Sequence, residues 1–133
     1  MVRIKISKTL EQKIRRGYPW VFHYQVQNEK VEGEPGDLAV VYDSKNQFLA
    51  IGLYDPESDI RLRVLQTSNP VDIDSIFFEE KFNRVLQLRA YLPGEGTTGY
   101  RALNGENDGF TGLVLDRYES KLVLKLFQSA WHP

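Results

Sequence analysis

The chain has no cysteine among its 133 residues. Without a thiol it can form neither a disulfide framework nor a thiolate metal site, and every mechanism that uses a cysteine nucleophile is excluded within it. Histidine occurs only as His23 and His132, which are too few for a metal site without cysteines. Neither has a triad partner nearby in the sequence, so we assign no catalytic function to either.

Long apolar runs are missing as well. The start, Met1 to Ile6, alternates charged and apolar residues and lacks the apolar run of a signal peptide. No later stretch is long enough to cross a bilayer. We therefore expect a cytoplasmic protein without a membrane partner.

The chain lacks an overall excess of either charge, since 17 Lys and Arg residues stand against 18 Asp and Glu residues. This balance argues against a disordered chain and against a globally basic nucleic-acid binder. The charges are nevertheless unevenly placed. Before Gln25 there is a single acidic residue, Glu11, and the basic residues of that segment are Arg3, Lys5, Lys8, Lys13, Arg15 and Arg16. We therefore expect a polyanionic partner to meet the N-terminal end.

Short strands dominate the first half of the predicted fold. Val2, Ile4 and Ile6 share one face at period two, which is typical of a half-buried strand. A short helix is predicted over residues 10–16, with Thr9 as its cap and Gly17 ending it in the left-handed conformation. Further strands are predicted at residues 20–22, 38–42, 48–54 and 60–64, and in the last one Arg61 and Arg63 alternate with apolar residues. This spacing predicts a compact barrel.

A different pattern begins after the turn-forming residues Thr67 to Pro70. Apolar residues at helical spacing predict a long helix, which Asp74 or Ser75 can cap and which Pro93 and Gly94 end. Strands are predicted near residues 100–103, 111–116 and 121–127. The sequence therefore predicts a mainly β fold with α (α+β), in which residues 1–67 form one domain and residues 72–133 a small helix-plus-antiparallel-strand domain.

Two loop motifs have mainly structural interpretations. Gly94 to Gly99 matches the spacing G-x-G-x-x-G, but it follows a helix and precedes a strand, the reverse of a nucleotide-binding loop, and so predicts a flexible linker. Asn104 to Gly109 resembles the opening of a calcium loop, yet Leu115 stands at the twelfth position, where a glutamate is needed. We interpret it as a hairpin turn whose Glu106 or Asp108 pairs with Arg101 or Arg117.

The basic cluster near the N-terminus is the most informative candidate site. Lysine and arginine side chains can neutralise phosphates, and a neighbouring aromatic ring offers a stacking face to an unpaired base. Lys13 and Arg16 are three residues apart on a helix whose Leu10 and Ile14 face the core, so the charges should form one exposed edge. The alternative is an ordinary solvated helix. Trp20 is expected in the core in either case.

The end of the chain follows an apolar strand without a capping helix or a polar tail. Its last six residues, Gln128 to Pro133, include a tryptophan. Such a residue at a terminus is more typical of a segment that packs onto something further, so we expect the chain to be part of a longer protein; a natural terminal strand is the alternative.

Four sequence segments occur in an order that resembles a known family. They are Gly17 to Phe22, Pro35 to Asp37, Gly52 to Ser58 with Ile60, Arg63 and Val64, and Gly105 to Tyr118. Together they look like the N-terminal third of the class I S-adenosylmethionine-dependent methyltransferases related to the 23S rRNA cytosine-C5 methyltransferase. Tyr18 stands where a histidine is common in the family, and Thr111 where a proline is common.

The resemblance implies a PUA domain, a pseudo-barrel that binds structured RNA, over about residues 2–65, followed by a companion domain that leads into a Rossmann-like catalytic domain. It also implies that the first helix and the glycine segment after it face the RNA, expected to be rRNA. The RNA-binding residues predicted from the basic cluster and the resemblance together are Lys8, Lys13, Arg15, Arg16, Gly17 and Tyr18. S-adenosylmethionine would be the cofactor of the full-length parent, with none bound by this chain.

Catalytic residues for such a reaction are absent from the sequence. Methylation at C5 of cytosine uses an activated thiolate that adds to C6, and the chain has no cysteine. No glycine loop between a strand and a helix is predicted that could hold the adenosyl group. We therefore predict an RNA-binding fragment without activity of its own that needs a missing C-terminal catalytic domain. The alternatives are a protein-interaction or homodimerisation module and, less consistent with the sequence, a small complete enzyme.

Overall fold

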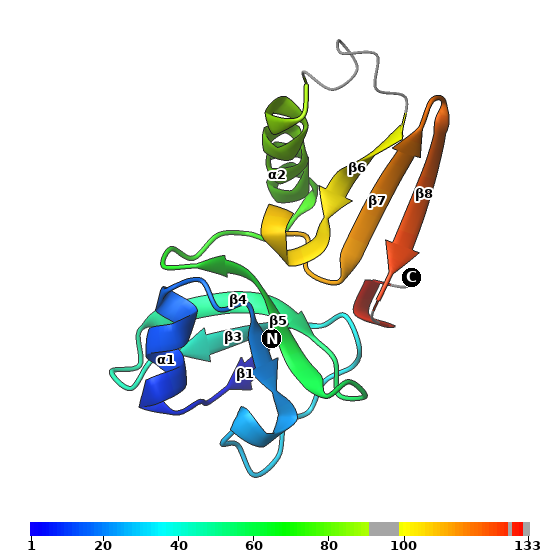
Figure 1. The fold of residues 1–133 in the computed structure, drawn as a ribbon. Helices are drawn as coiled ribbons and strands as arrows, with labels where there is room; N and C mark the ends of the chain where they lie inside the picture. Colours follow the sequence, from blue (N-terminus) through cyan, green and yellow to red (C-terminus); the bar gives the residue numbers. More distant parts are fainter. Residues whose placement is uncertain (91–98, 128, 132–133) are drawn as a thin grey trace. The chain divides into compact units, whose positions relative to one another are not determined.

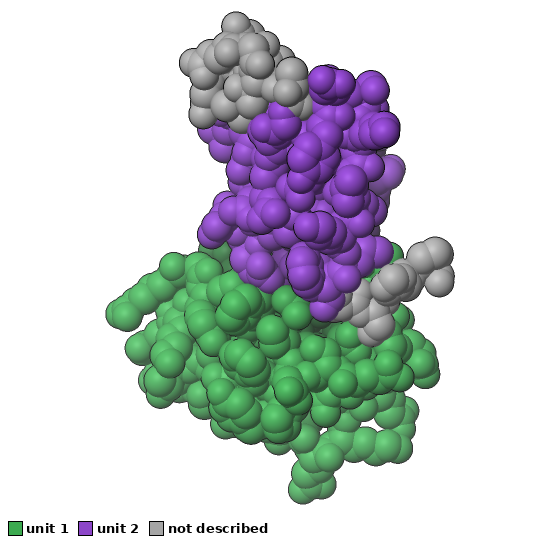
Figure 2. All heavy atoms as spheres, turned by 45° about the vertical axis from the view of Figure 1, so that its right-hand side comes forward, with its two compact units in different colours: residues 1–71, 128–133 green, residues 72–127 purple. Residues whose placement is uncertain are grey.

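A computed structural model describes residues 1–90, 99–127 and 129–131. The chain divides into two compact units, residues 1–71 with 128–133 and residues 72–127, which are coloured separately in Figure 2. The predicted linker motif at residues 94–99 lies outside the described residues except for Gly99, and so does His132. Among the described residues, none of the helices has the length and apolar character needed to span a membrane.

The first unit is built on a five-stranded mixed sheet (Figure 1). Its strands lie in the order β1-β3-β4-β5-β2, and β1 pairs with β3 in parallel while the other pairs are antiparallel. The elements along the chain are β1 (Val2–Ile4), α1 (Lys8–Arg15), β2 (Trp20–Phe22), the 3-10 helix η1 (His23–Gln25), β3 (Leu38–Tyr42), β4 (Phe48–Tyr54) and β5 (Ile60–Thr67). The register shifts between β3 and β4 and between β4 and β5 allow the sheet to bend.

Helix α1 begins earlier than the sequence predicted. Ser7, not Thr9, is its N-cap: the Ser7 side chain accepts a hydrogen bond from the amide of Leu10 at 3.2 Å. Serine and threonine both cap helices, so the residue types alone do not decide between Ser7 and Thr9. The end is as predicted, because Gly17 has a φ of +101°, which places it in the left-handed region.

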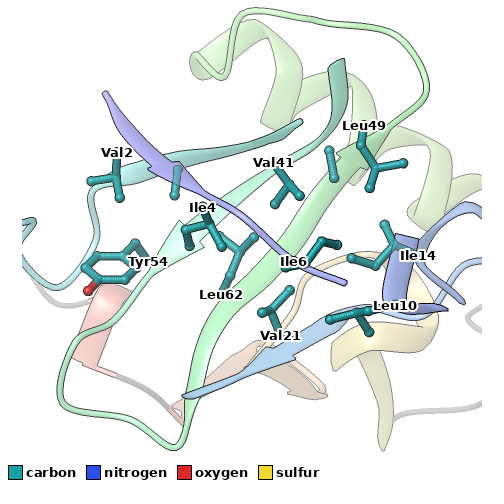
Figure 3. Close-up of a cluster of buried hydrophobic side chains, with 12 residues drawn as sticks. Val2, Ile4, Ile6, Leu10, Ile14, Val21, Val41, Leu49, Tyr54 and Leu62 are labelled. Atoms are coloured by element: carbon teal, nitrogen blue, oxygen red, sulfur yellow. The ribbon is translucent and has the colours of Figure 1, made fainter. Parts of the chain in front are cut away.

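The core of the first unit draws side chains from its strands and α1. Figure 3 shows Ile4, Ile6, Val21 and Leu62 among the labelled apolar side chains of this cluster. Ile14 of α1 is completely buried there, and burial of each such side chain stabilises the fold by about 2 kcal/mol. Arg63 alternates with the apolar residues of β5 as predicted, yet it is buried, and it pairs in register with Trp20 of β2.

The second unit packs one helix on a three-stranded antiparallel sheet. Its elements are α2 (Ser75–Leu88), β6 (Gly99–Asn104), the 3-10 helix η2 (Gly105–Asp108), β7 (Leu113–Tyr118) and β8 (Lys121–Leu126). Asp74 caps α2 by accepting a hydrogen bond from the amide of Phe77 at 2.9 Å, as predicted. Figure 1 shows α2 alongside β6, with β8 at the far edge of the sheet. Both sheets together confirm the predicted α+β fold class.

The turn after β6 is held by polar contacts that differ from the predicted ones. The carboxylate of Asp108 pairs with Arg89 at 2.9 Å and accepts a hydrogen bond from the amide of Asn104. Glu106 accepts hydrogen bonds from the hydroxyl of Thr111 and from the amide of Gly112. The predicted pairing with Arg101 or Arg117 is therefore wrong, because these arginines lie on strands whose register gives them other partners.

Candidate nucleic-acid interface

Helix α1 has a buried stripe and one exposed face, and its basic residues lie at both margins of that face. Leu10 and Ile14 face the core. Lys8, Glu11 and Arg15 recur at helical spacing and line a surface shared with the β3–β4 turn. Lys13 lies two residues before the end of the helix and off this spacing, so it is about 160° from Arg15 around the helix axis. The structure therefore divides the predicted basic cluster between two surfaces.

Arg15 is committed to a contact within the fold. Its guanidinium donates to the carboxylate of Asp43 at 2.8 Å, and the Asp43 side chain is nearly buried. The pKa of Asp43 lies below its ordinary value because the backbone amides of Gln47 and Lys45 and the Arg15 guanidinium all donate to the carboxylate. Arg15 thus secures α1 to the β3–β4 turn, which leaves it less free to neutralise a phosphate.

The other side of α1 offers open cationic groups beside a glycine. Lys13 and Arg16 are exposed, and no ion pair of either is found among the described residues. Gly17 follows directly, and a Cβ built on it would meet no atom within 4 Å. A ligand backbone can therefore approach the Gly17 main chain without steric hindrance. We call Lys13, Arg16 and Gly17 the open edge of α1.

A row of aromatic rings continues from the open edge. Tyr18, Trp20, Phe22 and Tyr24 occupy alternate positions along β2 and into η1, whereas Val21 between them faces the core. Successive rings lie 6.3, 6.2 and 5.7 Å apart between centroids, and the last pair is stacked. Tyr24 is 72% exposed. We expected Trp20 to lie in the core, and it is only partly buried.

This aromatic row contains two residues that the sequence reasoning missed. Phe22 and Tyr24 were not among the predicted contact residues, although aromatic residues at every second position from 18 to 24 were visible as a signal. Unpaired bases stack on such rings. Tyr18 remains half-buried and packs against the core cluster, which leaves only part of its ring for a ligand.

Lys8 lies apart from the open edge. It borders a hollow in the first unit together with Arg3 and Lys5 of the N-terminal segment. The Arg3 guanidinium lies over the Tyr42 ring, 5.0 Å from its centroid. The structure thus brings Lys8 together with basic residues that the sequence reasoning counted as charge and did not assign to a site.

The described residues were compared with what an S-adenosylmethionine site and a metal site need. The described strand-to-helix connections, residues 5–7 and 68–74, contain no glycine that would let the backbone approach an adenosyl group. Within the described ranges, no group of three His, Asp or Glu side chains could hold a metal ion. Among the described residues, the cations of the open edge and the rings of the aromatic row are groups suited to contact with an anion or a base.

Comparison with known proteins identifies a domain family and several relatives for this chain. Residues 4–67 match the model of the PUA-like domain. Similar curated proteins include the "Ribosomal RNA large subunit methyltransferase" of Deinococcus radiodurans, which is 50% identical over 99% of this chain and 34% of its own length. The "Ribosomal RNA large subunit methyltransferase I" of Photobacterium profundum is 36% identical over 95% of this chain and 32% of its own length.

Residues 4–67 thus form a PUA-like domain, and almost the whole chain is similar to one part of proteins named as ribosomal RNA large subunit methyltransferases. It spans about a third of the length of the curated relatives it matches. A solved structure from Streptococcus mutans, described as a candidate SAM-dependent methyltransferase, superposes with a TM-score of 0.83 over 98% of this chain and 34% of its own. A second, described as a candidate methyltransferase complexed with SAH, also gives 0.83. At 18% identity, both show a shared fold.

Proposed function

We propose that this chain is the RNA-binding part of a larger S-adenosylmethionine-dependent rRNA methyltransferase and has no catalytic activity of its own. Its partner is structured RNA, and its place of action is the cytoplasm. The observation that carries the proposal is the open edge of α1, where two exposed cations flank a sterically open glycine within the PUA-like domain. This is the arrangement that a phosphate backbone requires.

The geometry of α1 supports different roles for the RNA contacts predicted from the sequence. Lys13, Arg16 and Gly17 form the principal phosphate contact, and Tyr18 with the aromatic row offers a stacking surface beside it. Lys8 contributes from the hollow on the other side of α1. Arg15 acts mainly through its ion pair with Asp43 and supports the helix.

Catalysis is assigned to the rest of the parent protein. The chain has no cysteine for attack on a cytosine, and the strand-to-helix connections at residues 5–7 and 68–74 have no glycine that would let S-adenosylmethionine approach. The names of the relatives and their greater length support a methyl-transferring domain elsewhere in the parent, where the cofactor binds.

Salt-dependent RNA binding tests the proposal. Fluorescence anisotropy with a labelled RNA hairpin should give an affinity whose logarithm falls with log salt at a slope of about −3 to −4, as for contact with about four phosphates. The double variant Lys13→Ala/Arg16→Ala removes two of these contacts and should reduce the slope by about 2. Absence of RNA binding at low salt contradicts the proposal.

A charge-matched variant in the second unit separates local contact from net charge. Arg84→Ala/Lys121→Ala removes the same two charges from exposed positions on α2 and β8. We expect its salt slope to equal that of the parent chain. An equal loss in both double variants would show that only overall charge matters, and the open edge would then not be the contact surface.

A second candidate function is a protein-interaction or homodimerisation module. The observation that favours it is the set of exposed apolar side chains of the second unit, namely Ile76, Leu88, Leu122, Val123, Leu124 and Phe127. Leu122, Val123 and Leu124 lie on the edge strand β8, and exposed apolar residues on an edge strand are typical of an interaction surface. A stable dimer in light scattering, together with no RNA binding at low salt, would favour this function over RNA binding.

A further inference from the structure

The hollow beside the start of α1 is a candidate base-binding pocket within the first unit. It has a volume of about 530 Å³ and is bordered by the N-terminal segment, α1 and the β3–β4 turn. That volume lies within the usual range of small-molecule pockets and is large enough for one nucleotide. Asn28 fixes the N-terminal wall, because its side chain accepts from the amide of Lys5 and donates to the carbonyl of Arg3.

One wall of the pocket offers a flat cationic stacking surface. The Arg3 guanidinium lies over the Tyr42 ring at 5.0 Å from its centroid, and both residues line the pocket. Arg3 itself is exposed. Unpaired bases stack on guanidinium planes as well as on aromatic rings. Lys5 and Lys8 are exposed at the rim, where they can neutralise the phosphates of a bound nucleotide.

A buried carboxylate supplies the polar group that such a pocket needs. Glu11 lines the pocket and is only 6% exposed. No hydrogen bond or ion pair of its carboxylate is found among the described residues, whereas the other carboxylate at the pocket, Asp43, is bound to Arg15 and two backbone amides. Neither oxygen of Glu11 is among the buried side-chain atoms without a partner, so the carboxylate is reachable from the pocket and can accept hydrogen bonds from a ligand with N–H groups.

We propose that this pocket binds an unpaired guanine of an RNA strand, with the base on Arg3 and Tyr42 and its Watson–Crick edge at Glu11. Guanine presents two parallel donors, N1–H and N2–H, which match the two oxygens of one carboxylate. Uracil presents one donor between two carbonyl oxygens, which the carboxylate repels. The inference rests on the proposed RNA binding and adds a base preference to it.

Single-base replacement in a short RNA tests the inference. The probes are oligouridine heptamers with guanosine, inosine or uridine at the centre, and inosine lacks only the N2 amino group of guanosine. Fluorescence anisotropy with the full chain should show guanosine bound about tenfold more tightly than inosine, as expected for the loss of one charge-assisted hydrogen bond to a base. This comparison needs no variant, so folding does not affect it.

The variant Glu11→Gln connects the preference to the pocket. It keeps the side-chain shape but offers one acceptor and one donor, so the ratio of guanosine to inosine affinity should fall to about threefold or less. Because loss of a negative charge strengthens RNA binding in general, the ratio is the quantity to compare. Glu29→Gln removes the same charge from an exposed position in the same unit and should keep the full ratio.

The outcomes separate this inference from the proposed function. Equal affinity for guanosine and inosine, with RNA binding intact, overturns the guanine pocket alone. An unchanged ratio in Glu11→Gln also overturns it, because the preference would then arise elsewhere. Failure of every RNA to bind overturns the proposed function itself.

Discussion

The two units differ in how completely they bury their apolar residues. In the first unit, residues from α1 and the sheet form one continuous cluster in which Ile14, Val21 and Leu62 are completely buried. In the second, the buried cluster consists of Val85, Leu103 and Phe110, with partly buried neighbours around it. Among the described residues, the first unit therefore has the larger buried apolar cluster.

The exposed side chains of the second unit follow from its layout. Helix α2 packs beside β6 and covers Leu113 and Leu115 of β7. Strand β8 lies beyond β7, at the sheet edge, so Leu122 and Leu124 are exposed by more than half. Helix α2 therefore covers side chains of β6 and β7, and those of β8 remain exposed.

Replacement of a glycine should have the largest effect and should distinguish the two sheets. In Gly52→Ala, the new Cβ would overlap the carbonyl oxygen of Arg63 and lie 2.9 Å from the Cα of Val64, so the backbone of β4 or β5 must move. We expect a loss of at least about 3 kcal/mol in the free energy of unfolding, measured by urea denaturation. In Gly99→Ala the Cβ meets only the Tyr118 ring at 3.3 Å, and we expect less than about 1 kcal/mol.

Truncation of a leucine should give the next largest contrast. Leu62 is completely buried in the first unit, and Leu62→Ala should lower the free energy of unfolding by about 3 kcal/mol. Leu124 is 54% exposed in the second unit, so Leu124→Ala should cost less than about 0.5 kcal/mol. Trp20 fluorescence follows the first unit, and circular dichroism follows the whole chain. Similar losses in the two variants would mean that Leu124 is covered in solution.

Loss of the Asp116 carboxylate in the second unit should have a smaller effect on stability, and that effect should depend on pH. The pKa of Asp116 lies below its ordinary value of 3.8 because Arg101 donates to the carboxylate at 2.8 Å and Lys125 adds its charge. A lowered pKa in the folded state stabilises the fold above that ordinary value, and this stabilisation is lost as pH falls through the folded pKa. Asp116→Asn should therefore lower the urea midpoint at neutral pH, and the difference should shrink below about pH 4. A constant difference at all pH values would contradict this origin.

Periodicity predicted most of the fold. The β3–β4 hairpin and the start of α2 at Asp74 are confirmed, because alternation and capping residues are local signals. The buried position of Arg63 was not predictable, since it depends on a partner strand far away in the sequence. The partners of Glu106 and Asp108 also escaped prediction, because Arg89 reaches Asp108 from α2 and that contact depends on tertiary packing.

The candidate site was predictable in composition and less so in arrangement. The charge count identified the N-terminal basic residues, and the helical period placed Lys13 and Arg16 together. The pairing of Arg15 with Asp43 was hidden, because the two residues are brought together only when the β3–β4 turn packs beside α1. For the same reason, the proximity of Arg3 to Tyr42 could not be inferred from spacing.

The central claim is that the first unit binds RNA through the open edge of α1. Chemical-shift mapping of the ¹⁵N-labelled full chain with an RNA hairpin that has an unpaired loop tests this claim most directly. We predict that the amides of Lys13, Arg16 and Gly17 shift together with those of the aromatic row, while those of α2 and β8 stay unchanged. Shifts confined to residues 72–127, or no shifts at low salt, would contradict the claim.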